Sequence, residues 1–403
     1  MDSLLMNFSR QLNDVFLLAL VLAALAAAIV LLLASLAARR AWRHLRTKQF
    51  DALSFKIHER WREMVRGEIP PEEWRTNSLH CEILQSIVIQ EIGAVTDKDR
   101  AGLQDFLRKS GLLDRCVDRV YNGHGWGRRR AMLALGAMQV PEAIPPLAEL
   151  LDDWQLDTRL AAVQALGRTG LAEAAEPILE THMVGGLKVP SDPLTNALMR
   201  CYAEQPTALL PFLRRSVGES RELIARVASE LATLAMADEM ILLAEDPNPE
   251  VRASAAKALA AAHLPVAIPA LAILIRDDVW FVRLRAVSAL NGIPHPRTIP
   301  LLLEAICDSN RLVRIRAAAA LSKFEHETTE ILQSIVDSRD RYALHAMISA
   351  LELGGGFKKV MAQLTDPALH NEAAARLVEA LREGSASLWS TRPADPVVES
   401  VFP

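Results

Sequence analysis

Residues that could catalyse a reaction or bind a metal ion are scattered along this chain. The four cysteines, at positions 81, 116, 201 and 307, form no Cys-x-x-Cys pair, and no histidine stands at the spacing of a zinc site. The glycine-rich stretch 123–130 lacks the GxxxxGK[ST] order with which a loop surrounds phosphate. We therefore expect no catalytic residue, no cofactor and no metal ion, and unpaired cysteines are typical of a reducing compartment.

The most regular charged feature is a set of Asp and Arg pairs in which the acid precedes the base by six residues. These pairs are Asp153 and Arg159, Asp246 and Arg252, Asp277 and Arg283, and Asp308 and Arg314. We interpret them as a structural ladder in which the Asp caps a helix and the Arg reaches a neighbouring Asp as a bidentate donor. An arginine row that binds phosphate or nucleic acid is the alternative, and the matched acids and a net charge of −4 disfavour it.

A repeat of 31 residues explains this spacing. The repeat aligns the segments that begin at Asp246, Asp277 and Asp308, and with them valines 251, 282 and 313 and leucines 259, 290 and 321. Arg128 and Arg159 differ by the same 31 residues in diverged copies. Between about 190 and 240 the sequence predicts that the period is lost, with Ile224 where an arginine is expected and a longer loop over 185–193.

Each repeat is expected to form two short helices. Pro269 and Pro300 stand at the first turn of the first helix, where the missing N–H has no partner to lose. Apolar residues in the second helix recur every three or four positions, as at Val282, Ala286 and Leu290. Aromatic residues make up only 5% of the chain, which favours helix over strand. Because neither helix can bury its apolar side alone, the repeats must stack on one another as a solenoid.

The pattern D-x-x-x-x-V-R-x-x-A-x-x-A-L, as in the segment from Asp277 to Leu290, resembles the HEAT and HEAT-like repeats of armadillo-type α-solenoids, including the phycobilisome-lyase type. The resemblance covers residues 120–355 and extends in weaker form over 78–383, which holds nine or ten units at about 31 residues each. It implies an all-α fold in which antiparallel helix pairs form a right-handed superhelix. It also implies a long surface that binds another macromolecule.

Two families that share this repeat perform chemistry. Deoxyhypusine hydroxylases hold two irons with His-Glu pairs placed just after the repeat's arginine, where this chain has residues such as Ala253 and Ser254. The His-Glu pairs at 58–59 and 326–327 lie outside those positions, and we interpret them as surface residues. Bilin lyase subunits are the second family, and a membrane segment would be an odd addition to one. The resemblance therefore implies no enzyme.

Residues 15–38 contain no charged side chain and predict a transmembrane helix of about 36 Å, long enough for a bilayer core of about 30 Å. The segment before it is not basic and the apolar run exceeds that of a signal peptide, so we expect an uncleaved anchor. The basic residues that follow the span are Arg39, Arg40, Arg43, Arg46 and Lys48, against Arg10 alone before it. This asymmetry predicts an N-terminus outside the cell and a cytoplasmic solenoid. The same basic residues either bind anionic headgroups or act as a plain topology signal.

Exposed aromatic and basic residues are the candidates for partner binding, because loops and turns carry recognition in solenoids. The candidates are Trp126, Arg128, Arg129, Arg130, Trp280, Phe281, Arg285, Arg316, Trp389 and Phe402. Trp280 and Phe281 occupy a turn, while Trp389 and Phe402 belong to a tail rich in small and polar residues. For each site, packing within the chain is the open alternative.

The sequence thus predicts five segments: a short extracytoplasmic N-terminus (1–14), a transmembrane helix (15–38), a basic juxtamembrane linker (39–77), a HEAT-repeat solenoid (78–383) and a flexible tail (384–403). We expect a single-pass protein of a bacterial inner membrane. Its function would be that of a scaffold or adaptor for a membrane protein, such as a polysaccharide synthase or a secretion complex, with no small-molecule substrate and no nucleic acid. The alternatives are a membrane-tethered enzyme with an unrecognised site and a nucleic-acid tether.

Overall fold

The computed structural model describes residues 2–390 apart from residues 62, 64, 65, 67, 69–77, 96, 186, 262–264, 294 and 367–371. Inside helices, some further side chains lie outside the description, among them those of residues 2–24 and 387–390. All regular structure in the described part is helical, without a strand, which confirms the all-α fold class. The chain divides into two compact units, unit 1 (Met1–Met138) and unit 2 (Gln139–Pro403).

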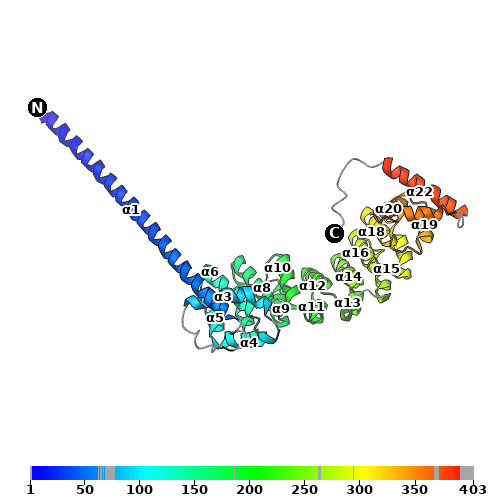
Figure 1. Ribbon diagram of the computed structural model, residues 1–403, viewed down its shortest axis with the longest axis horizontal. Helices are drawn as coiled ribbons and strands as arrows, with labels where there is room; N and C mark the ends of the chain where they lie inside the picture. Colours follow the sequence, from blue (N-terminus) through cyan, green and yellow to red (C-terminus); the bar gives the residue numbers. More distant parts are fainter. Residues whose placement is uncertain are drawn as a thin grey trace. The chain divides into compact units, whose positions relative to one another are not determined.

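Unit 1 begins with one continuous helix, α1 (Asp2–Glu59), which Figure 1 draws as a long rod. The boundaries expected at residues 14 and 38 both fall inside this helix. Its described apolar side chains between Leu25 and Leu36 are exposed, with Leu31 71% exposed. Among the helices in the described part of the chain, none is both long enough and apolar enough to cross a membrane.

The remaining helices of unit 1 pack into a small bundle beside the end of α1. They are α3 (Ser78–Glu91), the 3-10 turn η2 (Ile92–Ala94), α4 (Asp97–Lys109), α5 (Leu112–Asn122) and α6 (Gly125–Met138). α3 contacts both α1 and α6, and α5 packs along α6. Ile57 of α1 and Ile83 of α3 are fully buried, so burial of apolar side chains fixes the end of α1 against the bundle.

Unit 2 is a series of helix pairs. Its first part contains η3 (Pro141–Ala143), α7 (Ile144–Ala148), η4 (Glu149–Asp152), α8 (Leu156–Thr169), α9 (Ala172–Met183), α10 (Ser191–Cys201), η5 (Pro206–Leu209), α11 (Leu210–Arg215) and α12 (Gly218–Glu230). Its second part contains η6 (Leu234–Met236), α13 (Ala237–Leu242), η7 (Leu243–Glu245), α14 (Pro249–Ala261), η8 (Pro265–Ala267), α15 (Ile268–Leu274), α16 (Trp280–Leu290), η9 (Pro296–Thr298), α17 (Ile299–Ala305), α18 (Arg311–Leu321), α19 (Thr328–Asp337), α20 (Arg341–Leu353), α21 (Phe357–Leu364) and α22 (Glu372–Ser390).

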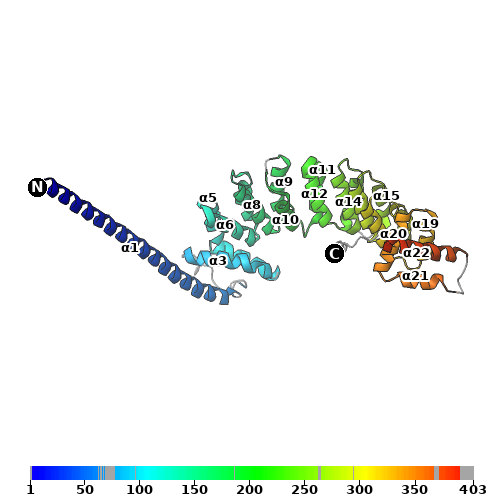
Figure 2. The ribbon, with the colours of Figure 1, turned by 90° about the horizontal axis from the view of Figure 1, so that it is seen from above.

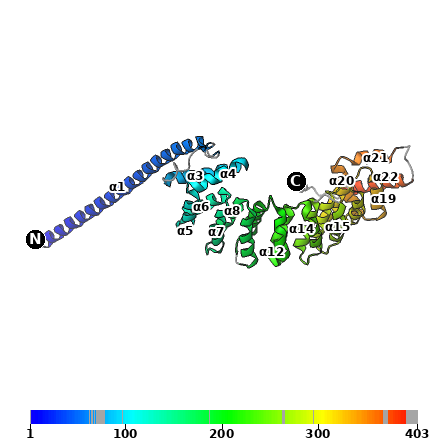
Figure 3. The same ribbon diagram turned by 90° about the horizontal axis from the view of Figure 1, so that it is seen from below.

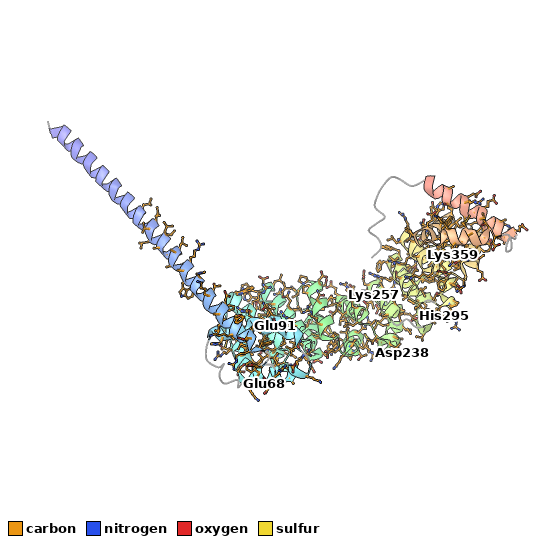
Figure 4. The ribbon with its side chains drawn as sticks, viewed as in Figure 1. Glu68, Glu91, Asp238, Lys257, His295 and Lys359 are labelled. Atoms are coloured by element: carbon orange, nitrogen blue, oxygen red, sulfur yellow. The ribbon has the colours of Figure 1, made fainter. Side chains whose placement is uncertain are left out.

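The second helices of successive pairs contact one another in chain order, from α8 through α10, α12, α14, α16, α18 and α20 to α22. Figure 2 shows these pairs side by side along unit 2. Lys257 on the second helix α14 and Asp238 on the first helix α13 mark opposite edges of this unit (Figure 4). The repeating valines 251, 282 and 313 are fully buried, so each pair covers the apolar side of the next.

Prolines start the first helices of several pairs. Pro269 and Pro300 lie in the opening turns of α15 and α17, as expected, and Pro145 has the same place in α7. Pro296 opens the 3-10 turn η9 directly before α17. A proline fixes φ near the helical value without the loss of a hydrogen bond at these positions, so it sets the point at which each first helix begins.

The 31-residue period persists through the region where the sequence predicts its loss. α12 begins at Gly218, which is 31 residues before the start of α14 at Pro249. Only α10 is displaced, because an extended loop precedes its first residue, Ser191. The expectation that Ile224 takes the place of the repeat's arginine is wrong: Arg221 lies 31 residues before Arg252 and fills that position.

The C-terminal helix α22 packs on α19, α20 and α21, as Figure 3 shows. It ends at Ser390, so the boundary expected for the tail at Gly384 falls inside a helix. A Cβ at Gly384 would lie 2.7 Å from Cδ1 of Ile348, and this close approach to α20 holds the segment in helical form. The side chain of Trp389 and the whole of Phe402 lie outside the described residues.

Candidate protein-binding surface

The Asp and Arg pairs connect neighbouring repeats. Nε of Arg252 donates to Oδ2 of Asp277 at 2.6 Å, and Nη2 donates to Oδ1 at 2.9 Å. One repeat further on, Arg283 contacts Asp308 through the same atoms at 2.6 and 3.0 Å. Each arginine thus grips the carboxylate 25 residues ahead with both branches of its guanidinium, which fixes the orientation of one repeat against the next.

Each of these aspartates also closes the turn in which it stands. Oδ1 of Asp277 accepts the backbone N–H of Val279, and Oδ1 of Asp308 accepts that of Asn310. The expectation that the aspartate caps the second helix is wrong, because the N-cap position falls two residues later, at Val279 in α16 and at Asn310 in α18. The carboxylate stabilises the turn that leads into the helix.

Burial and hydrogen bonding act in opposite directions on these carboxyl groups. Burial by itself raises the pKa of Asp277, but hydrogen bonds from Arg252 and from the N–H of Val279 outweigh it and hold the pKa below its usual value. Asp308 follows the same pattern with Arg283 and Asn310. The hydrogen bonds to these acids raise the pKa of Arg252 and Arg283. The guanidinium groups are therefore committed to the neighbouring repeat.

The ladder begins one repeat earlier than the sequence analysis placed it. Arg221 donates from Nε to Oδ2 of Asp246 at 2.7 Å. The signal that could have identified Arg221 is its 31-residue offset from Arg252. Arg159 bonds instead to backbone carbonyls, including that of Lys188, because the extended loop leaves no aspartate there.

The last arginine of the series, Arg314, has no aspartate ahead of it in the repeat. It donates to the carbonyls of Asp308 and Ser309, and its Cζ lies 5.2 Å from the centre of the Tyr342 ring. Arg341 flanks the same ring at 4.8 Å. Tyr342 is 53% exposed, so two guanidinium groups orient an aromatic ring that remains open to solvent.

Tyr342 belongs to a row of exposed side chains at the starts of consecutive second helices. We call this row the turn-edge patch, and its members are Trp280, Phe281, Arg311, Leu312, Arg314, Arg341 and Tyr342. Trp280 and Leu312 are 43% and 42% exposed, and Trp280 packs edge-on against Phe281 with ring centroids 6.1 Å apart. Trp, Tyr and Arg dominate the binding energy of protein interfaces, and here successive repeats present them along one edge.

A protein-family model described as HEAT repeats matches residues 115–183, 206–291 and 271–352 of the chain. These ranges together span more than half of its length. The chain belongs to the HEAT-repeat family. No curated protein matches it in sequence.

Solved structures resemble this HEAT-repeat protein at a distance. An engineered protein is 17% identical, with 77% of this chain and 97% of the other covered and a TM-score of 0.34. A crystal structure of importin beta is 15% identical, with 77% and 51% covered and a TM-score of 0.35. Human deoxyhypusine hydroxylase is 20% identical, with 77% and 98% covered and a TM-score of 0.21. These likenesses are too distant to carry a functional argument.

In unit 1 of the HEAT-repeat protein, the basic-aromatic candidates divide into two groups. Arg128 donates to the carbonyl of Val120 at 2.7 Å, and Arg130 donates to Ser86 Oγ and to a carbonyl of α3 at 2.7 Å. These two arginines hold the bundle together. Trp126, 73% exposed, and Arg129 project to solvent and are the members of this cluster that a partner can reach.

Unit 2 of the HEAT-repeat protein contains further candidates. Arg285 is exposed on α16, and Arg316 is half-buried at the equivalent place on α18. Trp154, which the sequence analysis did not single out, is 84% exposed in the turn before α8. Its position directly after Asp153 in that turn is the signal that could have identified it.

No group of three or more His, Cys, Asp or Glu side chains in the described part of the HEAT-repeat protein is placed to hold a metal ion. His58 lies at the end of α1 and His326 in the turn before α19, and both are exposed. The repeat positions that carry His-Glu pairs in deoxyhypusine hydroxylases hold other residues here, as at Leu284 and Arg285 on α16.

Proposed function

We propose that this protein is a membrane-anchored scaffold whose HEAT-repeat solenoid binds a protein partner through the turn-edge patch. A solenoid of stacked helix pairs is a fold typical of protein-interaction scaffolds, because it offers a long surface on rigid elements. The observation that carries the proposal is the exposure of Trp280, Leu312 and Tyr342 on consecutive repeats that the Arg–Asp ladder fixes against one another.

The anchor in this proposal is the uncharged segment 15–38. The exposed leucines and isoleucine of α1, such as Ile29 and Leu31, support it, because bare apolar side chains on a helix need a lipid or protein environment. Arg39 and Arg40 are exposed directly after the segment, and the side chains of Arg43 and Arg46 lie outside the described residues. The basic flank favours a cytoplasmic solenoid at the inner membrane of a bacterium.

The partner in this proposal is itself a membrane protein, for example an enzyme of cell-envelope polysaccharide synthesis or a secretion complex. Anchoring raises the effective concentration of the solenoid near such proteins without any new contact. The protein has no catalytic role of its own in this proposal. The nucleic-acid alternative is weakened by the engagement of Arg252 and Arg283 with aspartates.

Affinity purification from detergent-solubilised membranes tests the proposal. The double variant W280A/Y342A should lower recovery of co-purifying membrane proteins at least tenfold, because it removes two aromatic anchors. The matched control is L242A, which truncates a side chain that is 70% exposed on the first helix α13, away from the patch. Equal recovery with both variants, or a protein that purifies alone and turns over a substrate, contradicts the proposal.

A further inference from the structure

A cleft of about 470 Å³ lies between α3 and α5 in unit 1, outside the turn-edge patch. Cys81 and Gln85 of α3 form one wall, and Arg115, Asp118 and Arg119 of α5 form the other. This volume is within the range of sites that bind small ligands, so the cleft can take a few side chains or a chain end. A whole helix is too large for it.

The two arginines of the cleft are only lightly engaged by the protein. Nη1 of Arg115 donates to Sγ of Cys81 at 2.7 Å, which leaves its other N–H groups available. The guanidinium of Arg119 makes no hydrogen bond or ion pair with the described residues. Both arginines are half-buried. Their spacing of four residues places them on the same face of α5, so the cleft presents two adjacent guanidinium groups.

Gln85 contributes an acceptor that lacks a donor. This side chain is 1% exposed, its Nε2 donates to Sγ of Cys116 at 3.3 Å, and its Oε1 has no partner in the described part of the chain. A buried acceptor without a partner costs free energy that a donor on a ligand would restore. Burial raises the pKa of the Cys116 thiol to about 12, so this group stays neutral and adds no charge.

Asp118 is the acidic group that faces the arginines, and it is already occupied. Its Oδ1 accepts Nδ2 of Asn122 at 2.7 Å. With two arginines against one carboxylate, the cleft is positively charged. Gly123 keeps it open, because a Cβ there would clash with the backbone of Arg119 and lie 2.9 Å from its Cγ.

We propose that this cleft binds a carboxylate of a partner peptide between Arg115 and Arg119, while Gln85 Oε1 accepts an N–H from the same peptide. The inference rests on the proposed function, and it names the chemistry by which a protein partner is recognised. A carboxylate can come from a chain terminus or from an Asp or Glu side chain. Either source gives charge-assisted hydrogen bonds to guanidinium, the strongest polar contacts that the cleft offers.

Fluorescence anisotropy of the full chain in detergent micelles tests this inference with Gly-Ala hexapeptides that carry an uncharged dye. One peptide has a free C-terminal carboxylate, the second has the same sequence with an amidated end, and the third is amidated and contains one Glu. We expect the fully amidated peptide to bind at least tenfold more weakly than one of the two carboxylate peptides. The tighter of those two identifies the source of the carboxylate.

Variants assign the binding to the cleft. R115A and R119A should each weaken the carboxylate peptide about tenfold, and D118N should strengthen it because it removes the opposing charge. K98A, which removes an exposed positive charge from α4 in the same unit, should leave binding unchanged. Equal binding of carboxylate and amidated peptides, no binding, equal loss in K98A, or tighter binding of inorganic phosphate than of any peptide overturns the inference. Co-purification through Trp280 and Tyr342 is measured separately, so either result stands without the other.

Discussion

At the scale of single residues, the ladder shows why an ion pair can serve as a joint. The side chains of Arg252 and Asp277 are 18% and 7% exposed, whereas those of the surface pair Arg276 and Glu304 are 60% and 44% exposed. The same chemistry has a different effect in the two places. Removal of one member of a shielded pair leaves a desolvated charge, while an exposed charge returns to water.

We therefore predict that D277A lowers the free energy of unfolding by about 2 kcal/mol, since it deprives Arg252 of a bidentate partner. The matched variant E304A, which frees the exposed Arg276, should change it by less than about 1 kcal/mol. Urea unfolding of the full chain in detergent measures both. Similar losses for the two variants would show that the ladder adds nothing beyond a surface pair.

The ladder also predicts a dependence of stability on acid. Because the pKa of Asp277 and Asp308 is lower in the folded protein than in the unfolded chain, their contribution is complete above the unfolded value of about 4. It is lost as the pH falls through the lower folded value. The double variant D277N/D308N should therefore show a flatter fall in Tm below about pH 4 than the wild type. Parallel Tm profiles of the two proteins over this range would contradict the assignment.

At the scale of elements, close helix contact matters more than helix propensity. Gly167 on α8 faces α10, where a Cβ would lie 2.5 Å from Cα of Ala197 and 2.6 Å from its Cβ. Gly127 on α6 faces only Cδ of Arg119, at 3.9 Å. Glycine therefore permits the approach of α8 and α10, and it has no such role at position 127.

We expect G167A to destabilise the protein by about 1–3 kcal/mol, because α8 and α10 must separate to admit the methyl group. The control G127A should be neutral or stabilising by up to about 1 kcal/mol, since alanine is the better helix former. Thermal unfolding followed by circular dichroism measures both changes. A stabilised G167A would mean that the α8–α10 contact relaxes without cost.

At the scale of the whole molecule, the proposed anchor and the solenoid make separate contributions. The segment 15–38 determines where the protein resides, and the repeats determine what it binds. Stacked repeats contact only their neighbours, so a change at one end of the series leaves distant pairs intact. The anchor can therefore be tested without disturbing the turn-edge patch.

We predict that the full chain stays in the membrane pellet after extraction at alkaline pH, because residues 15–38 bury an uncharged helix in lipid. A variant that lacks residues 1–38 should move to the supernatant and retain its circular dichroism signal. Release of the full chain, or a mature N-terminus beyond residue 40, would contradict the anchor.

The sequence by itself determined the helical repeat and its family. Each pair buries its apolar side against the next pair, so the same positions must be apolar in each copy, and valines 251, 282 and 313 record this requirement as a period. The pairing of Arg252 with Asp277 follows the same period. Arg221 was available to the same reasoning, and a misplaced alignment at Ile224 concealed it.

Only the tertiary structure decided which side chains are exposed and which distant residues meet. The spacing of Trp154 from its neighbours does not reveal that it is 84% exposed, because exposure depends on what packs over the turn. The cleft joins Cys81 and Arg115, which are 34 residues apart and follow no repeat. Periodic contacts leave a trace in the sequence because the same packing recurs, whereas a contact made once leaves none.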